Sequence, residues 1–183
     1  MTMCRRTKFL SVAVSGLLAF WTASAEVTVN GLFSDHMVLQ RGKPIAVFGT
    51  ADSGEAVTVR LNNREAKTKT GKDGRFLVML PAMQAGGPYT MEIAGEDNTI
   101  VINDVMLGEV CLCSGQSNME MPMKGFKNQP VENANMDILR SKNPHIRLFT
   151  VKRTSTITPQ NDVVGSWKEA APVSVRDFSA TAY

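Results

Sequence analysis

Residues 105–120 read VMLGEVCLCSGQSNME, and the chain changes character on either side of them. From Val105 to Cys113 the residues are nearly all apolar, and only a Gly-Glu pair interrupts the run. Continuous apolarity is typical of a strand buried on both faces of a parallel sheet, whereas alternation is typical of a half-buried strand. A turn-forming Ser-Gly-Gln-Ser-Asn sequence follows. The stretch therefore predicts a buried strand, then a turn, and an α/β domain that begins at residue 107.

The residues after this stretch continue the α/β pattern. Residues 131–141 predict a helix, because Val131, Ala134 and Ile138 fall on one face. Residues 146–151, IRLFTV, predict a second strand. The order strand, helix, strand implies a right-handed parallel crossover, and active sites of such sheets form at the carboxyl ends of the strands. We expect the turn after the first strand to lie at that edge.

The residues before the stretch, from 26 to 106, predict an all-β sandwich. Six short β-prone runs occur at roughly ten-residue spacing, and several of them alternate apolar and polar residues. Sequences rich in Gly, Asn, Asp and Pro separate the runs and predict turns. The runs are 27–29, 45–48, 57–61, 76–80, 89–93 and 99–102, and the turns are 62–63, 72–74, 86–88 and 95–98.

The first 25 residues have the three-part layout of a secretory signal peptide. Residues 1–8 carry three positive charges, residues 9–21 are apolar, and Ala23-Ser24-Ala25 is a small-x-small cleavage sequence. A membrane anchor is the alternative, but as a helix the apolar run would rise only about 20 Å, short of a hydrocarbon core of about 30 Å. We expect cleavage after Ala25, export to the periplasm or the exterior, and no membrane span in the rest of the chain.

The charge balance argues against a nucleic-acid-binding protein. The formal net charge is +3, with 20 Lys and Arg against 17 Asp and Glu. Because three of the basic residues lie in the expected signal peptide, the remaining chain is close to neutral. Binding to phosphate groups requires a clustered basic excess, which this chain lacks.

Cys111 and Cys113 are the cysteines that would remain after signal cleavage. On a strand they would share a face with Cα atoms about 6.5–7 Å apart, at the edge of the disulfide range. A metal site needs more ligands than the chain groups in one place. We expect two buried thiols, without a disulfide or a metal.

Ser117 has two interpretations. As a nucleophile it would project from the strand-to-helix corner that Gly115 allows, beside backbone N–H groups able to stabilise an oxyanion. As a helix cap it would start the capping box Ser-Asn-Met-Glu of residues 117–120. The pattern alone favours the cap, because Met119 replaces the second Gly of a Gly-x-Ser-x-Gly elbow.

Asp35 and His36 form another candidate pair for catalysis. Adjacent residues on an extended segment point to opposite faces, so the pair is poorly placed to cooperate. A structural turn is the expected role.

Four segments of the chain together resemble one known family. They are residues 32–41 (LFSDHMVLQR), 108–123 (GEVCLCSGQSNMEMPM), 165–167 (GSW) and 177–183 (DFSATAY). The second of them resembles the signature of the sialate O-acetylesterases, carbohydrate esterases of the SGNH-hydrolase superfamily. The other segments resemble further blocks of that family in the same order, so the resemblance covers essentially the whole mature chain.

The resemblance implies a flavodoxin-like SGNH fold for residues 107–183 and a serine esterase that removes acetyl groups from sugar hydroxyls. The family's nucleophile falls on Ser117, and its backbone N–H is one expected oxyanion donor. Gly115, Gln116 and Asn118 are expected to shape the turn or to contact the O-acetylated carbohydrate. Acetyl transfer to a serine and release by water need no metal or organic cofactor.

A serine nucleophile also needs a base, usually a histidine. The resemblance places this histidine in an Asp-x-x-His segment farther downstream, and no such segment occurs in the chain. His145 is expected at the amino end of its strand, away from the active-site edge, and His36 belongs to the β part. Asp177 is expected to cap an apolar helix over 178–183. We therefore expect an N-terminal fragment that is inactive, or nearly so, by itself.

The alternative is a non-catalytic exported β-sandwich protein that binds a glycan or another partner and carries a degenerate esterase remnant. The intact Gly-Gln-Ser-Asn string of residues 115–118 favours the esterase for the parent protein. The missing base favours the alternative for this chain as it stands.

Overall fold

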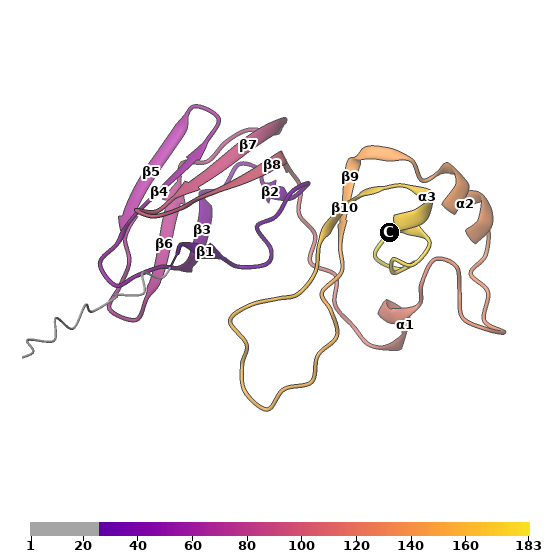
Figure 1. Cartoon of the computed structure of the whole chain (residues 1–183). Helices are drawn as coiled ribbons and strands as arrows, with labels where there is room; N and C mark the ends of the chain where they lie inside the picture. Colours follow the sequence, from indigo (N-terminus) through magenta and orange to yellow (C-terminus); the bar gives the residue numbers. More distant parts are fainter. Residues whose placement is uncertain (1–25) are drawn as a thin grey trace, which may run out of the picture.

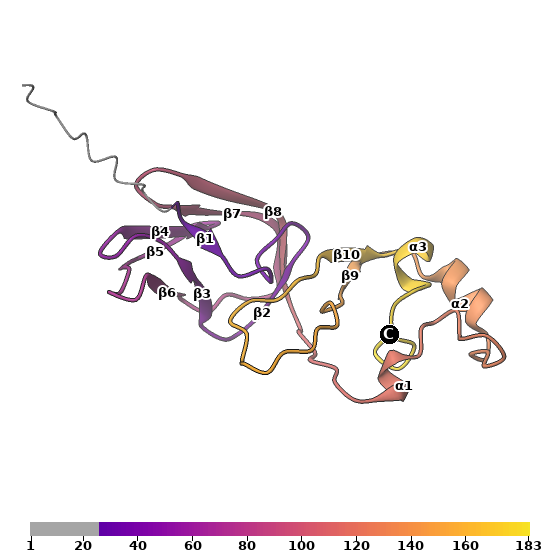
Figure 2. The same cartoon turned by 60° about the horizontal axis from the view of Figure 1, so that its bottom comes forward.

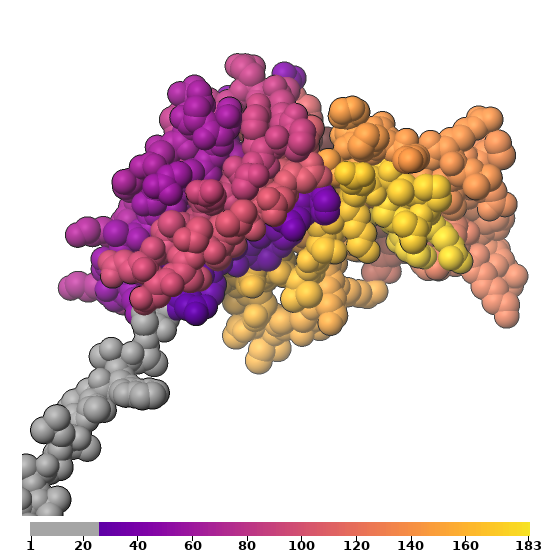
Figure 3. Space-filling model, turned by 45° about the horizontal axis from the view of Figure 1, so that its top comes forward, coloured from indigo at the N-terminus to yellow at the C-terminus, as the bar shows by residue number. Residues whose placement is uncertain are grey.

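The computed structural model describes residues 26–183, so the expected signal peptide lies outside the described residues. Strands dominate residues 26–108, which we call the β module, and short helices with one strand pair make up residues 109–183, the second part. Figure 1 shows the two parts next to each other, joined by the segment after β8, and a long loop between β9 and β10 of the second part. Figure 3 shows them in direct contact.

The β module contains two sheets. The smaller is antiparallel, in the order β1-β3-β6, with β1 at Thr28–Val29, β3 at Ile45–Thr50 and β6 at Arg75–Leu80. The larger has the order β2-β8-β7-β4-β5, with β2 at Val38–Gln40, β4 at Ala56–Leu61, β5 at Arg64–Lys69, β7 at Gly86–Ala94 and β8 at Thr99–Gly108. Its pairs are antiparallel except β2 with β8, which are parallel.

The alternating residues of these strands bury one face of each sheet. On β6, Phe76, Val78 and Leu80 are buried, whereas Leu77 and Met79 are about half exposed. The buried side chains of both sheets form a single apolar core. All six predicted strands are present, because each of them supplies the alternating apolar residues that this core requires.

Two strands and one turn differ from the predictions. The β2 and β5 strands were not predicted, and β5, with the sequence REAKTK, has only half-buried or exposed side chains. The turn at residues 62–63 is confirmed and joins β4 to β5. The turn predicted at 86–88 is wrong, because this stretch begins β7. Gly87, at φ 126°, lets the strand pass against Met106 in an irregular register.

The apolar run from residue 105 to 113 is not one buried strand. β8 ends at Gly108, and residues 109–116 contain neither helix nor strand. Leu112 is 95% exposed. No strand of residues 26–183 pairs with this segment, so it has no sheet in which to be buried. Cys111 and Cys113 are free but exposed, which makes the expectation of buried thiols wrong.

The second part contains three short helices and one antiparallel strand pair. The helices are α1 at Ser117–Glu120, α2 at Ala134–Arg140 and α3 at Pro172–Val175, and the strands are β9 at Asn143–Phe149 and β10 at Trp167–Ala170. The predicted helix and second strand are therefore present. The predicted parallel crossover is not formed within the described residues, because β9 pairs only with β10 and does so antiparallel.

A second, smaller core holds this part together. Met123, Leu148, Ala170 and Val175 are buried in it, and side chains of α2 and of the C-terminal residues pack against them.

None of the helices in residues 26–183 has the length and hydrophobicity that a membrane crossing requires.

The predicted C-terminal helix over 178–183 is replaced by a single turn. The Ser179 carbonyl accepts the Tyr183 N–H at 3.1 Å, and the Ser179 hydroxyl accepts the Ala182 N–H at 3.3 Å. The capping role expected of Asp177 therefore falls on Ser179. Asp177 instead forms an ion pair with Lys124, and this hydrogen bond lowers the pKa of its carboxyl group.

Candidate functional site

Ser117 is the first residue of α1 and is exposed. The N-cap of this helix is Gln116, whose carbonyl accepts the N–H groups of Met119 at 2.9 Å and Glu120 at 3.2 Å. The helix has no side-chain cap, and the Glu120 carboxylate pairs with Arg153 at 2.7 Å. The capping box considered from the sequence is therefore not formed, and the Ser117 hydroxyl is not used as a cap.

The other predicted site residues surround Ser117 on the same corner of the chain. Gly115 lies close to α1, because a Cβ at this position would be 3.4 Å from the Cβ of Met119. Gln116 caps the helix through its backbone, and Asn118 follows Ser117 within it. All four predicted residues are exposed. The structure thus presents a short, solvent-facing corner in which the serine begins the helix.

The structure does not bring a histidine to Ser117. His36 lies in the β module, where its Nδ1 atom is 2.6 Å from an Asp104 carboxylate oxygen. His145 is the third residue of β9, at the amino end of the strand as predicted, and is exposed. Within residues 26–183, no hydrogen bond joins Ser117 to either imidazole.

Asp35 and His36 do not act as a pair. The Asp35 carboxylate accepts the backbone N–H of Asn103 at 2.7 Å, whereas His36 faces Asp104. Both side chains tie a turn with φ 68° at His36 to the neighbouring β8 strand. The expected structural role is therefore confirmed.

A hydrogen-bonded clamp fixes the start of the segment that leads to Ser117. The Glu109 carboxylate accepts hydrogen bonds from Gln40 at 2.8 Å and from Arg41 at 2.6 Å. The Gln40 side-chain oxygen accepts the N–H of Val110 at 2.9 Å. The hydrogen bonds from Gln40 and Arg41 lower the pKa of Glu109, so its carboxylate stays charged. The end of the 32–41 block thus holds the chain where it leaves the β module.

The beginning of the same block meets the GSW segment of the second part. The indole N–H of Trp167 donates to the Leu32 carbonyl at 2.9 Å, and the ring packs against the core of the β module. Its other side contacts Phe149, with ring centroids 5.2 Å apart. Gly165 lies so close to this phenyl ring that a Cβ would be 2.5 Å from it. Two segments whose contacting residues are 135 positions apart in the sequence therefore form one joint.

The loop between β9 and β10 also returns to the β module (Figure 1). The Asn30 side chain donates to the Asn161 carbonyl at 2.9 Å, and the Gly31 N–H donates to the Asp162 carboxylate at 2.7 Å. A Cβ on Gly31 would lie 2.1 Å from the carbonyl oxygen of Val163. Only glycine allows the loop to approach the backbone this closely.

Replacing Gly31 by Ala is therefore expected to release this loop. The added methyl group collides with backbone, so the two hydrogen bonds to Asn161 and Asp162 are lost and the free energy of unfolding falls by about 1–2 kcal/mol. Limited proteolysis should then cut within residues 151–166 faster than in the wild type. Gly108→Ala is the control, because its Cβ would meet only Val38, at 3.5 Å. Equal cleavage of both variants would contradict the close approach.

A buried arginine completes the joint between the two parts. The Arg147 side chain is 4% exposed, and its guanidinium group pairs with Asp104 of β8, at 3.0 Å, and with Glu169 of β10. His36 contacts the same Asp104 carboxylate. The four residues form a charged network, which we call the Arg147 network.

The Arg147 network also contains the group most like a metal site. Ligand atoms of His36, Asp104 and Glu169 lie within 4.8 Å of one another. The Arg147 guanidinium already pairs with both carboxylates, and a metal cation would face its buried positive charge at close range. The arrangement fits an ion-pair network better than a metal centre. Sequence reasoning missed it because its members come from four separate segments.

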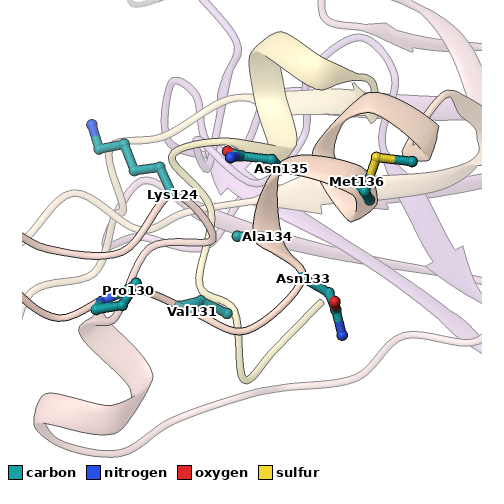
Figure 4. A pocket seen from close by; sticks show the side chains of 7 residues that line it. All are labelled: Lys124, Pro130, Val131, Asn133, Ala134, Asn135 and Met136. Atoms are coloured by element: carbon teal, nitrogen blue, oxygen red, sulfur yellow. The ribbon is translucent and has the colours of Figure 1, made fainter.

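Ser117 lines neither of two cavities in the second part of the chain. One, of about 270 Å³, lies beside the start of α2 (Figure 4) and is lined by Lys124, Pro130, Val131, Asn133, Ala134, Asn135 and Met136. The other, of about 310 Å³, lies between the β9–β10 pair and α3. Ser117 therefore lies on an exposed corner of the chain and outside both of these cavities.

Comparison with known proteins relates the chain to esterases. No protein-family model matches it. It is 31% identical over 151 residues to the sialate O-acetylesterase of Rattus norvegicus, covering 74% of the chain and 27% of that protein. It is 29% identical over 144 residues to the sialate O-acetylesterase of Homo sapiens, covering 72% of the chain and 26% of that protein. The chain thus spans about a quarter of the length of these relatives.

A solved structure has the same fold. The crystal structure of a carbohydrate acetylesterase from Xanthomonas citri matches with a TM-score of 0.81 and 31% sequence identity. The match covers 86% of this chain and 35% of that chain. It therefore extends over both the β module and most of the second part.

Proposed function

We propose that this chain, which belongs to the sialate O-acetylesterase family, carries the nucleophile of an esterase that removes O-acetyl groups from carbohydrates. The observation that carries the proposal is the exposed Ser117 at the start of α1, with its hydroxyl not used as a helix cap. Kinship with esterases at about 30% identity and a TM-score of 0.81 support it.

The proposed reaction is acyl transfer in two steps. The Ser117 Oγ attacks the acetyl carbonyl, and the tetrahedral intermediate collapses to an acetyl-serine while the sugar oxygen leaves as an alcohol. Water then attacks the acetyl-serine and releases acetate. The backbone N–H of Ser117 is the proposed oxyanion donor, and Gly115, Gln116 and Asn118 shape the corner or contact substrate.

The base that accepts the serine proton belongs, in this proposal, to a part of the protein beyond residues 26–183. His36 is engaged by Asp104 in the β module, and His145 lies near the amino end of β9. The relatives are about four times as long as the matched region, which leaves room for a histidine and an acid elsewhere. We assign residues 26–106 to a β-sandwich and residues 107–183 to the N-terminal part of an SGNH-type domain.

Export is part of the same proposal. The basic, apolar and small-residue regions of residues 1–25 support a signal peptide cleaved after Ala25. The mature protein would then meet acetylated glycans outside the cytoplasm. The 32–41 block of the β module contacts the second part through Leu32 and Arg41. These contacts give the block a docking role and weaken the alternative of a free glycan-binding module.

Acetate release from two acetylated substrates tests the proposal. The full-length protein is incubated with O-acetylated sialic acid and, separately, with acetylated xylan, and free acetate is measured. Release from at least one of them, lost in Ser117→Ala, is the expected result. Saccharide binding without acetate release from any acetylated sugar would favour the binding protein instead.

A further inference from the structure

The helix that carries Ser117 is too short to hold its own orientation. α1 is a single turn, and the N–H groups of Met119 and Glu120 bond to the Gln116 carbonyl that precedes the helix. Isolated helices shorter than about 12–15 residues are marginal in water. The direction in which Ser117 points must therefore depend on groups outside α1.

Residues 176–183, which we call the C-terminal strap, supply such groups. The strap lies beside α1 in both Figure 1 and Figure 2. Its backbone pairs with the residues that follow α1: Met123 donates to the Phe178 carbonyl at 2.8 Å, and Ala180 donates to the Met121 carbonyl at 2.8 Å. Phe178 and Ala180 also pack against the second core, so the strap is anchored independently of α1.

Thr181 connects the strap to the helix itself. Its hydroxyl donates to the carbonyl of Asn118 at 3.0 Å, across 63 residues of sequence. The carbonyl groups of a final helical turn have no partner within the helix, so Thr181 provides a cap that α1 lacks. The Asn118 carbonyl belongs to the peptide unit that joins Asn118 to Met119, so this hydrogen bond fixes the helix backbone one residue beyond Ser117.

We propose that Thr181 is a positioning residue for Ser117, acting through the Asn118 carbonyl. The inference rests on the proposed function, in which Ser117 is the nucleophile. Ser179 also reaches α1, with its hydroxyl 3.3 Å from the Met119 sulfur, but it caps its own turn as well. Thr181 makes a single side-chain hydrogen bond, which makes it the simpler residue to test. Because Thr181 is exposed, removing its hydroxyl leaves no internal cavity.

Three variants of the full-length protein test this role. Thr181→Val removes the hydroxyl at nearly constant shape, Thr181→Ser keeps it, and Thr90→Val changes an exposed threonine of β7 in the β module. With p-nitrophenyl acetate, Thr181→Val is expected to lower kcat about tenfold with KM nearly unchanged, because a misplaced nucleophile loses productive encounters rather than substrate binding. Thr181→Ser and Thr90→Val should retain wild-type kcat.

Hydrogen exchange decides the question independently of activity. Thr181→Val is expected to speed amide exchange in residues 117–123 about two- to tenfold, the effect of one lost hydrogen bond, while the melting temperature stays the same. Unchanged exchange in this segment would overturn the inference whether or not the protein is active. A wild-type kcat in Thr181→Val would also overturn the inference. So would a loss of kcat in Thr181→Ser as large as the loss in Thr181→Val. An inactive wild type with faster exchange in the variant would instead contradict the proposed function alone.

Discussion

Replacing Ser117 by Ala is expected to lower kcat for acetate release by at least about 10⁴-fold in the full-length protein. The substitution removes the only atom that can form the acetyl-serine, so the two-step reaction has no substitute path on the enzyme. Stability should stay within about 0.5 kcal/mol of the wild type, because Ser117 is exposed and does not cap α1. Initial rates and thermal melts of both proteins provide the measurement.

Ser114→Ala is the matched control for this variant. Ser114 lies three residues earlier on the same exposed segment. It is expected to keep wild-type kcat, since the chain places it before the corner and outside the helix. Equal losses in the two variants would show that the segment, and not the Ser117 hydroxyl, matters for activity.

Replacing Arg147 by Met is expected to lower the free energy of unfolding by about 2–3 kcal/mol, less than the loss of a fully buried ion-pair partner because the carboxylates are partly exposed. Methionine keeps much of the volume but removes the charge that Asp104 and Glu169 share. These carboxylates are 24% and 47% exposed, whereas Arg147 is 4% exposed. The joint between the β module and the second part should weaken most, and urea unfolding measures the loss.

Arg60→Met separates this effect from a general effect of losing an arginine. Arg60 also lies between two carboxylates, Glu65 and Glu92, but its side chain is 48% exposed. A solvated pair contributes little, so the expected loss is below about 1 kcal/mol. If the two variants lose the same stability, burial of Arg147 is not what makes its network matter.

Local patterns predicted six of the eight strands of the β module, because their own sequences show which side chains are buried. Phe76, Val78 and Leu80 of β6 alternate with exposed residues, and this alternation is visible without knowledge of any partner. The polar strand β5 was not predicted, because it forms through its pairing with β4 and has no alternating apolar residues of its own.

Predictions that needed distant partners were less successful. The apolar residues 110–113 resemble part of a buried strand. A strand is buried only if neighbouring strands flank it, and no strand of residues 26–183 pairs with this segment. For the same reason the sequence could not indicate that Cys111 and Cys113 would be exposed.

In the candidate site, too, local features could be predicted from the sequence and contacts between distant residues could not. Ser117 and its neighbours form one continuous string, so sequence identified them together, although only the structure showed that Gln116 and not Ser117 caps the helix. The Arg147 network joins residues from 36 to 169, and no spacing rule connects such positions. Thr181 was part of a resembling segment, but its contact with the Asn118 carbonyl required the fold.

Covalent trapping identifies which residue of the protein is the nucleophile. The full-length protein is treated with an organophosphorus ester such as diisopropyl fluorophosphate, digested, and mapped by mass spectrometry, with loss of acetate release followed in parallel. One adduct is expected, on the Ser117 hydroxyl, formed at the rate at which activity disappears. An active enzyme that is inhibited by modification at another residue, with Ser117 unmodified, would contradict this expectation.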